Sequence, residues 1–316
     1  MAANIISLPF LNPVKFVEMD YENISAYLTK HFDDFLMTEQ TADYAFMNQT
    51  CYAQKWQTTD ICKFQFESNY SPINISLIDS NGQIVGSALV LSNVLSNKYE
   101  PGKYVFEGEY SFADVPEGFY YFKMTTGSPV LKTFISEPLH VKALHENTCY
   151  IGYSNSRYHG DVIFETGIVF GLRVEAMLGN FKPGGKRDIY EDEKLNPTVL
   201  KATPFRQFDF IIGGYFGIPE WMVDKLNWIW SCNNVTIDGK SFAADESVIE
   251  PKGDLDYPLK GVIMKVREGI NRGSKIVSTE GSTEQKLLVV YNIESKLFGD
   301  ISAAGANNTI PIKSLE

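Results

Sequence analysis

The stretch from Tyr52 to Asp79 constrains the fold most, because it holds two runs rich in β-branched and aromatic residues separated by a corner at Pro72. In the second run, Ile73–Ile78, large apolar side chains alternate with other residues at the period of two that is typical of a half-buried strand. The pair Asn81-Gly82 follows, and such a pair beside an alternating segment is the strongest short-range signal for a β-hairpin. The stretch therefore predicts an all-β module.

The strand pattern continues through a first domain that we expect to span residues 50–142. A Pro-Glu-Gly corner precedes the aromatic run Phe119–Met124, and Pro138 marks an edge or the end of the last run. Trp56 is expected to anchor the core of this domain. The expected strands lie at residues 61–66, 73–78, 83–91, 104–112, 119–124 and 131–141. About six or seven strands at this spacing predict a β-sandwich of the immunoglobulin or fibronectin kind.

A second, less regular sandwich-like domain is expected at residues 148–298, since 316 residues are too many for a typical single core. Its one helix is predicted at residues 220–231, where Met222, Leu226, Ile229 and Trp230 form an apolar stripe at helical spacing. The run Gly179–Asp188 reads as a flexible, locally basic loop. The expected strands are residues 149–153, 163–178, 199–202, 206–212, 235–237, 260–267 and 286–293.

Residues 1–49 are predicted to be an extended arm followed by an irregular or partly helical region, and residues 299–316 an extended tail. Residues 1–50 hold two basic and seven acidic side chains, and Pro9 and Pro13 bracket a short apolar segment. Such an arm packs either on its own domain or on a neighbouring subunit. We expect residues 1–16 and the segment from Gly299 to bind adjacent copies.

The overall charge limits the class of partner. A net charge of −11 disfavours a nucleic-acid or anionic-membrane binder, since both require a basic face.

The N-terminus lacks the features of a signal peptide, and no apolar run approaches the roughly 20 residues of a spanning helix. A protein that stays in the cytoplasm where it is made is therefore expected. The four cysteines are too far apart for a zinc site, and a disulfide between Cys51 and Cys62 is a minor alternative.

No constellation of residues predicts an enzyme. His140 and His145 would point to opposite faces of a strand, so a metal site with them is not expected, and the same holds for His31 and His159. Gly179-x4-Gly184 lacks the lysine of a phosphate loop, because Gly185 stands in its place. We therefore predict no catalytic, cofactor-binding or metal-binding residues and no cofactor.

Three blocks of sequence resemble proteins of tailed bacteriophages and prophages of Bacteroidetes-type hosts, including the crAss-like group. They are QTCYAQKWQTTDICKFQF with NYSPINISLIDSNGQIV, then ISEPLHVK with IGYSNSR and GDVIFETGIVFGLRVEA, and finally FIIGGYFGIPEWMVDKLNWIWSCNNVTIDGKSF. The similarity covers about residues 50–270. It implies a non-enzymatic virion protein of the tail, neck or baseplate. Such a protein assembles in the host cytoplasm into a homo-oligomeric ring that contacts neighbouring virion proteins.

Three other functions stay open. A carbohydrate- or receptor-binding module would use exposed aromatic rings, for example Tyr99, Tyr158 or Phe181, to stack on a host-surface glycan. A baseplate part of a contractile injection system would have the same sequence features as a phage protein. A glycan-active enzyme would need two carboxylates in one cleft, for which Asp254, Asp256 and Glu191 are the candidates.

Overall fold

The computed structural model describes residues 6–19, 52–96, 102–128, 131–214, 217–245, 251–252 and 259–269, and the fold is mainly β. The chain divides into a compact unit of residues 1–270 and a second unit of residues 271–316. All the described residues belong to the first unit. Several sequence-based expectations fall outside them: the strand 286–293, the tail 299–316, and the residues His31, Cys51, Tyr99, Asp254 and Asp256.

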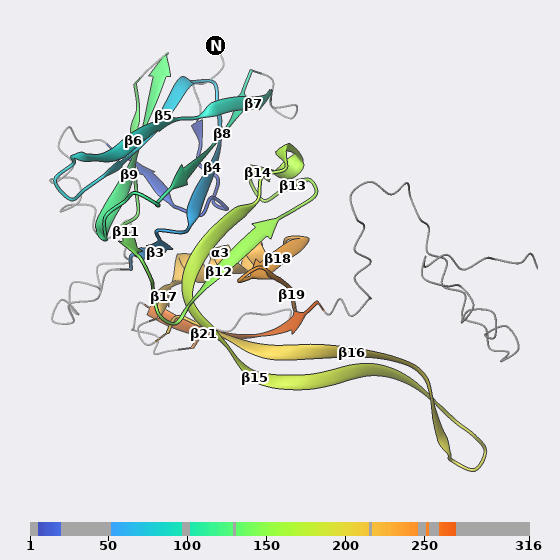
Figure 1. Cartoon of the computed structure of the whole chain (residues 1–316). Helices are drawn as coiled ribbons and strands as arrows, with labels where there is room; N and C mark the ends of the chain where they lie inside the picture. Colours follow the sequence, from blue (N-terminus) through green and yellow to red (C-terminus); the bar gives the residue numbers. More distant parts are fainter. Residues whose placement is uncertain are drawn as a thin grey trace, which may run out of the picture. The chain divides into compact units, whose positions relative to one another are not determined.

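The first half of the chain forms two groups of strands around one core, and every pairing within them is antiparallel except the parallel pairing of β11 with β3 (Figure 1). In one group the order is β1 (Ile6–Ser7), β4 (Ile61–Ser68), β8 (Tyr104–Ser111) and β7 (Ser92–Ser96). The other contains β6 (Ile84–Val90), β5 (Ser71–Ile78) and β9 (Gly118–Ser128), and beyond β9 come β10 (Thr133–Ser136) with β2 (Phe16–Glu18), and β11 (Leu139–Lys142) with β3 (Gln54–Gln57).

The local signals of the first half are confirmed. Gly82 has a φ of 79° in the turn that joins β5 to β6, where a glycine is tolerated without strain. The corner at Pro72 carries the chain from β4 in one sheet to β5 in the other. Trp56 is fully buried and packs on Phe112 at a ring-centroid distance of 5.2 Å, so it is part of this core as expected.

The second half closes a ring of six strands in place of the expected second sandwich. The strand pairings run from β12 through β18, β19, β21, β16 and β15 back to β12, and every pairing is antiparallel. Closure leaves none of these strands with an open edge along its paired length. The six strands are β12 (Thr148–Ser154), β15 (Phe170–Glu191), β16 (Pro197–Ile212), β18 (Asn234–Ile237), β19 (Lys240–Ala244) and β21 (Leu259–Glu268).

Short elements complete this ring, which we call the barrel. They are β13 (Tyr158–His159), β14 (Val162–Ile163), the 3-10 helix η2 (Phe164–Thr166), β17 (Ile218–Pro219) and β20 (Pro251–Lys252). The helix α3 (Glu220–Trp230) follows β17, and its apolar stripe lies in the same core as the inward side chains of all six strands. The predicted helix is confirmed, and it fills the barrel core.

Two long strands extend beyond the barrel (Figure 1). β15 and β16 stay paired from Ala176↔Ile212 to Glu191↔Pro197, while the other neighbours of these strands end near Arg206 and Glu175. We call residues 180–206 the ribbon. The loop expected at Gly179–Asp188 is therefore wrong, because these residues are part of β15. Glycine and proline weaken a strand in a sheet interior, but a two-stranded ribbon consists only of edges, where they are tolerated.

Residues 6–19 pack within their own chain. Asn12 exchanges side-chain hydrogen bonds with the backbone of Gln65 on β4, at 2.8 and 3.0 Å. On the other side, the hydroxyl of Tyr153 on β12 donates to the carbonyl of Leu11 at 2.6 Å. The segment therefore joins the first core to the barrel. Residues 6–16 thus pack on their own chain, the expectation that residues 1–16 bind adjacent copies stays a prediction, and residues 1–5 lie outside the described part.

Candidate functional site

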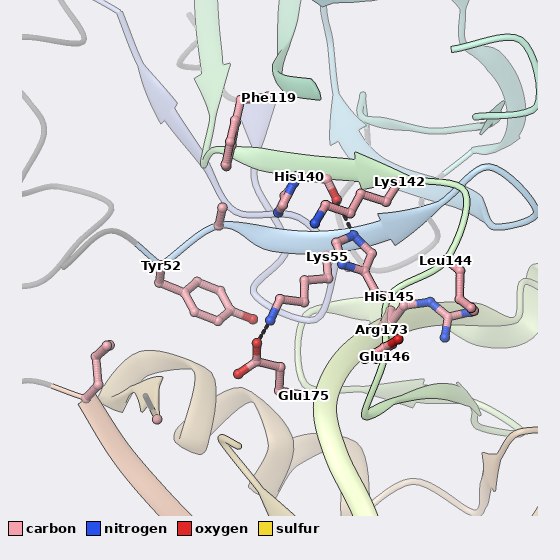
Figure 2. A pocket seen from close by; sticks show the side chains of 13 residues that line it. Tyr52, Lys55, Phe119, His140, Lys142, Leu144, His145, Glu146, Arg173 and Glu175 are labelled. Carbon is pink, nitrogen blue, oxygen red and sulfur yellow. Dashed lines mark hydrogen bonds and ion pairs between the residues drawn. The ribbon is translucent and has the colours of Figure 1, made fainter. Parts of the chain in front are cut away.

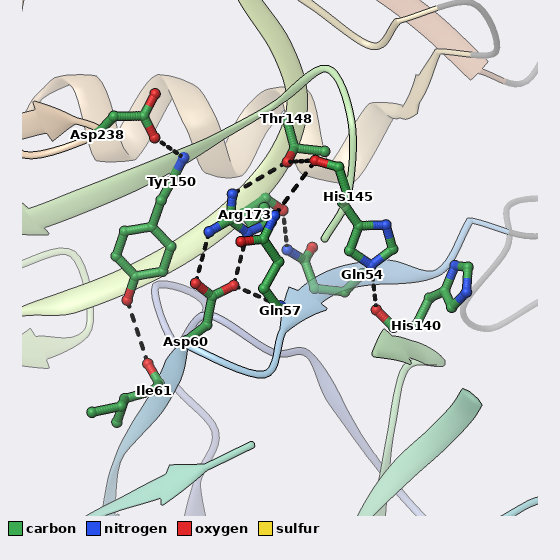
Figure 3. Close-up of polar contacts among 10 residues, drawn as sticks. All are labelled: Gln54, Gln57, Asp60, Ile61, His140, His145, Thr148, Tyr150, Arg173 and Asp238. Atoms are coloured by element: carbon green, nitrogen blue, oxygen red, sulfur yellow. Dashed lines mark hydrogen bonds and ion pairs between the residues drawn. The ribbon is translucent and has the colours of Figure 1, made fainter. Parts of the chain in front are cut away.

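A buried ion pair joins the first core to the barrel (Figure 3). Arg173 on β15 donates to both carboxylate oxygens of Asp60, at 2.8 Å from Nε and 2.7 Å from Nη2. The hydroxyl of Thr148 on β12 accepts a third bond from Nη1 at 3.2 Å, and the backbone N–H of Gln57 donates to Asp60 at 2.8 Å. Arg173 and Asp60 are 8% and 6% exposed. Two parallel bonds fix the orientation of both groups, so the pair sets how the two cores meet.

A cavity of about 660 Å³ lies beside this ion pair, and its floor is one face of three paired strands (Figure 2). His140 on β11 is opposite Phe119 on β9 and Lys55 on β3, so the three side chains form a row on one face. Lys142 lies two residues further along β11 and shares that face. The other face of β11 points into the core through Val141, which is fully buried.

The floor of the cavity combines charged and aromatic side chains. Lys55 forms an ion pair with Glu175, and burial together with Lys142 lowers the pKa of Lys55 to about 8. Phe119 stacks on the imidazole of His140 at a centroid distance of 4.3 Å and an interplanar angle of 16°. Phe119 nevertheless keeps 57% of its surface exposed, which leaves an open aromatic surface at the rim.

The two histidines that line the cavity are in contact. Their ring centroids are 4.9 Å apart, and Nε2 of His145 lies 2.9 Å from the carbonyl oxygen of His140. The expectation that they point apart is wrong, because His145 lies beyond the end of β11, where the period of two no longer applies. Burial lowers the pKa of His140 to about 4, and the neighbouring His145, Lys142 and Lys55 act in the same direction. Both lysines therefore impose a positive potential on an uncharged imidazole.

A second buried pair of charges lies under the N-terminal segment. Glu137 is fully buried, and one of its carboxylate oxygens accepts a bond from the backbone N–H of Lys15 at 3.0 Å. Burial raises its pKa to about 7, although Lys225 on α3 acts in the opposite sense. Lys225 is 1% exposed and donates to the carbonyl of Asn12 at 2.8 Å, and burial lowers its pKa to about 8. These groups hold residues 6–19 in place between the two cores.

The residues named for the alternative functions lie apart. Tyr158 on β13 and Phe181 on β15 are 50% and 55% exposed, and they belong to different elements. Glu191 lies at the end of β15 in the ribbon, and the ring of His159 contacts the carbonyl oxygen of Trp228 at 3.2 Å. Within the described part of the chain, no group of three His, Cys, Asp or Glu side chains converges as a metal site would require. The thiols of Cys62, Cys149 and Cys232 are buried and free.

Comparisons with known proteins add no family to this description. The sequence matches no protein-family model, and no curated protein and no solved structure matches the chain. Among the helices of the described residues, none is long and apolar enough to cross a membrane.

Proposed function

We propose that this protein is a non-enzymatic structural component of a virion, in the tail, neck or baseplate, which assembles with copies of itself into a ring. The bacteriophage-like blocks of sequence support the virion, and we assign the first core to a sandwich of the immunoglobulin or fibronectin kind. The observation that carries the assembly is the ribbon. A baseplate part of a contractile injection system would use the same geometry.

Almost all side chains of the ribbon are exposed to solvent in the single chain. Between residues 180 and 204, every residue is exposed to solvent except Gly184 and Asp192, which are intermediate. A two-stranded hairpin alone is at best marginally stable in water. A partner that covers one face of the ribbon, or that pairs with its edge strands, therefore stabilises it.

One face of the ribbon is mostly apolar. Side chains of paired residues point to the same face, so the register of β15 and β16 assigns each residue to a side. This face carries the apolar residues Pro183, Ile189, Val199, Ala202 and Pro204 together with Arg187, Glu191 and Arg206, while Leu200 lies in the bulge between Lys201 and Val199. Ile189, Val199 and Leu200 are 56%, 54% and 69% exposed. The opposite face carries the lysines Lys182, Lys186 and Lys201. Asp188, Tyr190 and Phe205 share the lysine face, so the ribbon suits a partner surface that offers both apolar and acidic groups.

Charge favours a second copy as the partner. The ribbon holds six basic and four acidic side chains, a formal charge of +2. Since the whole chain carries −11, the remaining residues carry −13. A ribbon on one copy and the body of the next are therefore oppositely charged. Contact between two different surfaces of identical chains is head-to-tail, and it closes into a ring when the rotation permits.

Removing the ribbon tests the proposal. A variant in which Asn-Gly joins Lys182 directly to Gln207 retains the barrel pairing and ends the hairpin in a two-residue turn. We expect this variant to melt near the wild-type temperature and to lose the oligomer in light scattering and electron microscopy. The pair Ile84→Ser and Val90→Ser is the matched control, since both residues are exposed apolar side chains on β6. Equal oligomers from the shortened and full-length chains would overturn the proposal.

A further inference from the structure

The cavity beside the Arg173–Asp60 pair is lined by three cationic side chains, Lys55, Lys142 and Arg173, and by two carboxylates, Glu146 and Glu175. Lys55 is already paired with Glu175, and Arg173 is paired with Asp60. Lys142 and Glu146 line the same cavity, and neither forms an ion pair within the described part of the chain; Glu146 is exposed to solvent, whereas Lys142 is partly buried. One ammonium group is therefore available to a ligand.

Hydrogen-bond donors and an apolar surface lie next to this ammonium group. Figure 2 shows the side chain of Lys142 running towards His140, whose ring nitrogens have no hydrogen-bond partner among the described residues. The ring of Phe119 is stacked on His140 and is more than half exposed. Tyr52 also lines the cavity, and its hydroxyl donates to Gln54 at 2.9 Å. The volume of about 660 Å³ is within the usual range for a small-molecule site, and charged or imidazole side chains form much of its lining.

We propose that this cavity binds a small organic carboxylate. The carboxylate lies against Lys142 and His140, and the apolar part of the ligand lies towards Phe119. One free ammonium group matches the single charge of a carboxylate, whereas a phosphate dianion carries a second charge and Lys55 is held by Glu175. This site does not depend on assembly, so the ribbon experiment and the binding experiment can fail separately.

Titration calorimetry with benzoate, acetate and inorganic phosphate tests the site on the full chain. We expect saturable binding of benzoate, and binding of acetate and phosphate that is weaker by about tenfold or more. The C2-proton resonance of His140, assigned by its loss in His140→Gln, is expected to shift during the benzoate titration. No saturable binding up to about 10 mM benzoate, or phosphate that binds as tightly as benzoate, would overturn the assignment.

Two lysine variants separate a built site from general electrostatic attraction. Lys142→Met is expected to weaken benzoate binding by about tenfold or more, because it removes the free cation. Lys123→Met on the neighbouring strand β9 removes the same charge and should leave benzoate binding unchanged. Lys142 and Lys123 are both partly exposed, and thermal melts verify that both variants fold. Equal weakening by the two substitutions would refute the site.

Discussion

The two ends of β15 belong to one continuous strand, yet they lie in opposite environments. From Phe170 to Val174 every residue is buried in the barrel. From Asn180 to Glu191 the same strand is exposed on both faces, and among the described strands it pairs with β16 alone. Backbone pairing alone therefore does not decide burial. At the ribbon end, two strands pair as in a sheet, but no second layer of the described structure packs on either face.

This difference shows which side chains stabilise the monomer. At the barrel end, apolar residues lose their contact with water when the chain folds, and each contributes to the free energy of unfolding. In the ribbon, side chains of similar size remain in water unless a second molecule covers them. The same leucine-to-alanine change should thus have a large effect at one end and almost none at the other.

The largest effect is expected from Leu172→Ala at the barrel end. Leu172 is fully buried in the barrel core, so the substitution leaves a cavity and should lower the free energy of unfolding by about 2–5 kcal/mol. Chemical denaturation with unchanged m-value measures this loss. A change below about 1 kcal/mol would show that the two ends of β15 do not differ as the structure indicates.

A buried carboxylate and an exposed one should also differ in their effect on stability. Asp60→Asn leaves Arg173 buried without a countercharge, and we expect a loss of about 3 kcal/mol in the free energy of unfolding. The matched control is Asp188→Asn in the ribbon, where the carboxylate is exposed and the expected change is within about 0.5 kcal/mol. If both variants lost the same stability in parallel urea titrations, the Arg173–Asp60 pair would not join the two cores.

The pH dependence of stability should also differ between buried and exposed carboxylates. Burial raises the pKa of Glu137 from 4.5 to about 7, so the folded state binds more protons than the unfolded state between these values. The stability that this group contributes is therefore present below pH 4.5 and is lost as the pH rises through 7. Lys225, with a pKa of about 8, stays charged over this range.

Glu137→Gln remains neutral and avoids this loss. Relative to the wild type, we expect the free energy of unfolding of the variant to rise by on the order of 1–3 kcal/mol between pH 4.5 and 7.5. Glu191→Gln in the exposed ribbon is the control and should show no such trend. Urea titrations at the two pH values measure the difference. If the difference in free energy of unfolding between Glu137→Gln and the wild type were the same at both pH values, the raised pKa would be contradicted.

The sequence predicted elements where a local rule operates. The Asn81-Gly82 turn, the alternating run Ile73–Ile78 and the helix with Met222 and Leu226 all follow from backbone preference and periodic burial. Closure of the barrel could not be predicted, because it depends on pairings between strands far apart in the chain, such as Ile151↔Ile237. Local patterns predict strands, and they do not specify their partners.

The ribbon and the cavity were missed for a related reason. Residues 179–188 show no alternation because neither face of the ribbon is buried, so the usual signal for a strand is absent. The cavity floor is made by cross-strand neighbours, and His140 and Lys55 are 85 positions apart in the chain. One signal was available for the second buried pair. Lys225 lies within the apolar stripe of the predicted helix, and a charged residue at such a position needs a buried partner.

The smallest effect on the monomer is expected at the ribbon end of the comparison. Leu200 is 69% exposed, so Leu200→Ala should change the free energy of unfolding of the monomer by less than about 0.5 kcal/mol. If a second copy covers the ribbon at Leu200, the same substitution removes apolar contact there and weakens assembly. Sedimentation over a concentration series, together with denaturation of the dilute monomer, measures both quantities on one sample. A loss of monomer stability as large as that of Leu172→Ala would mean that the ribbon folds back on its own chain. A loss confined to assembly would instead place Leu200 in the contact between copies.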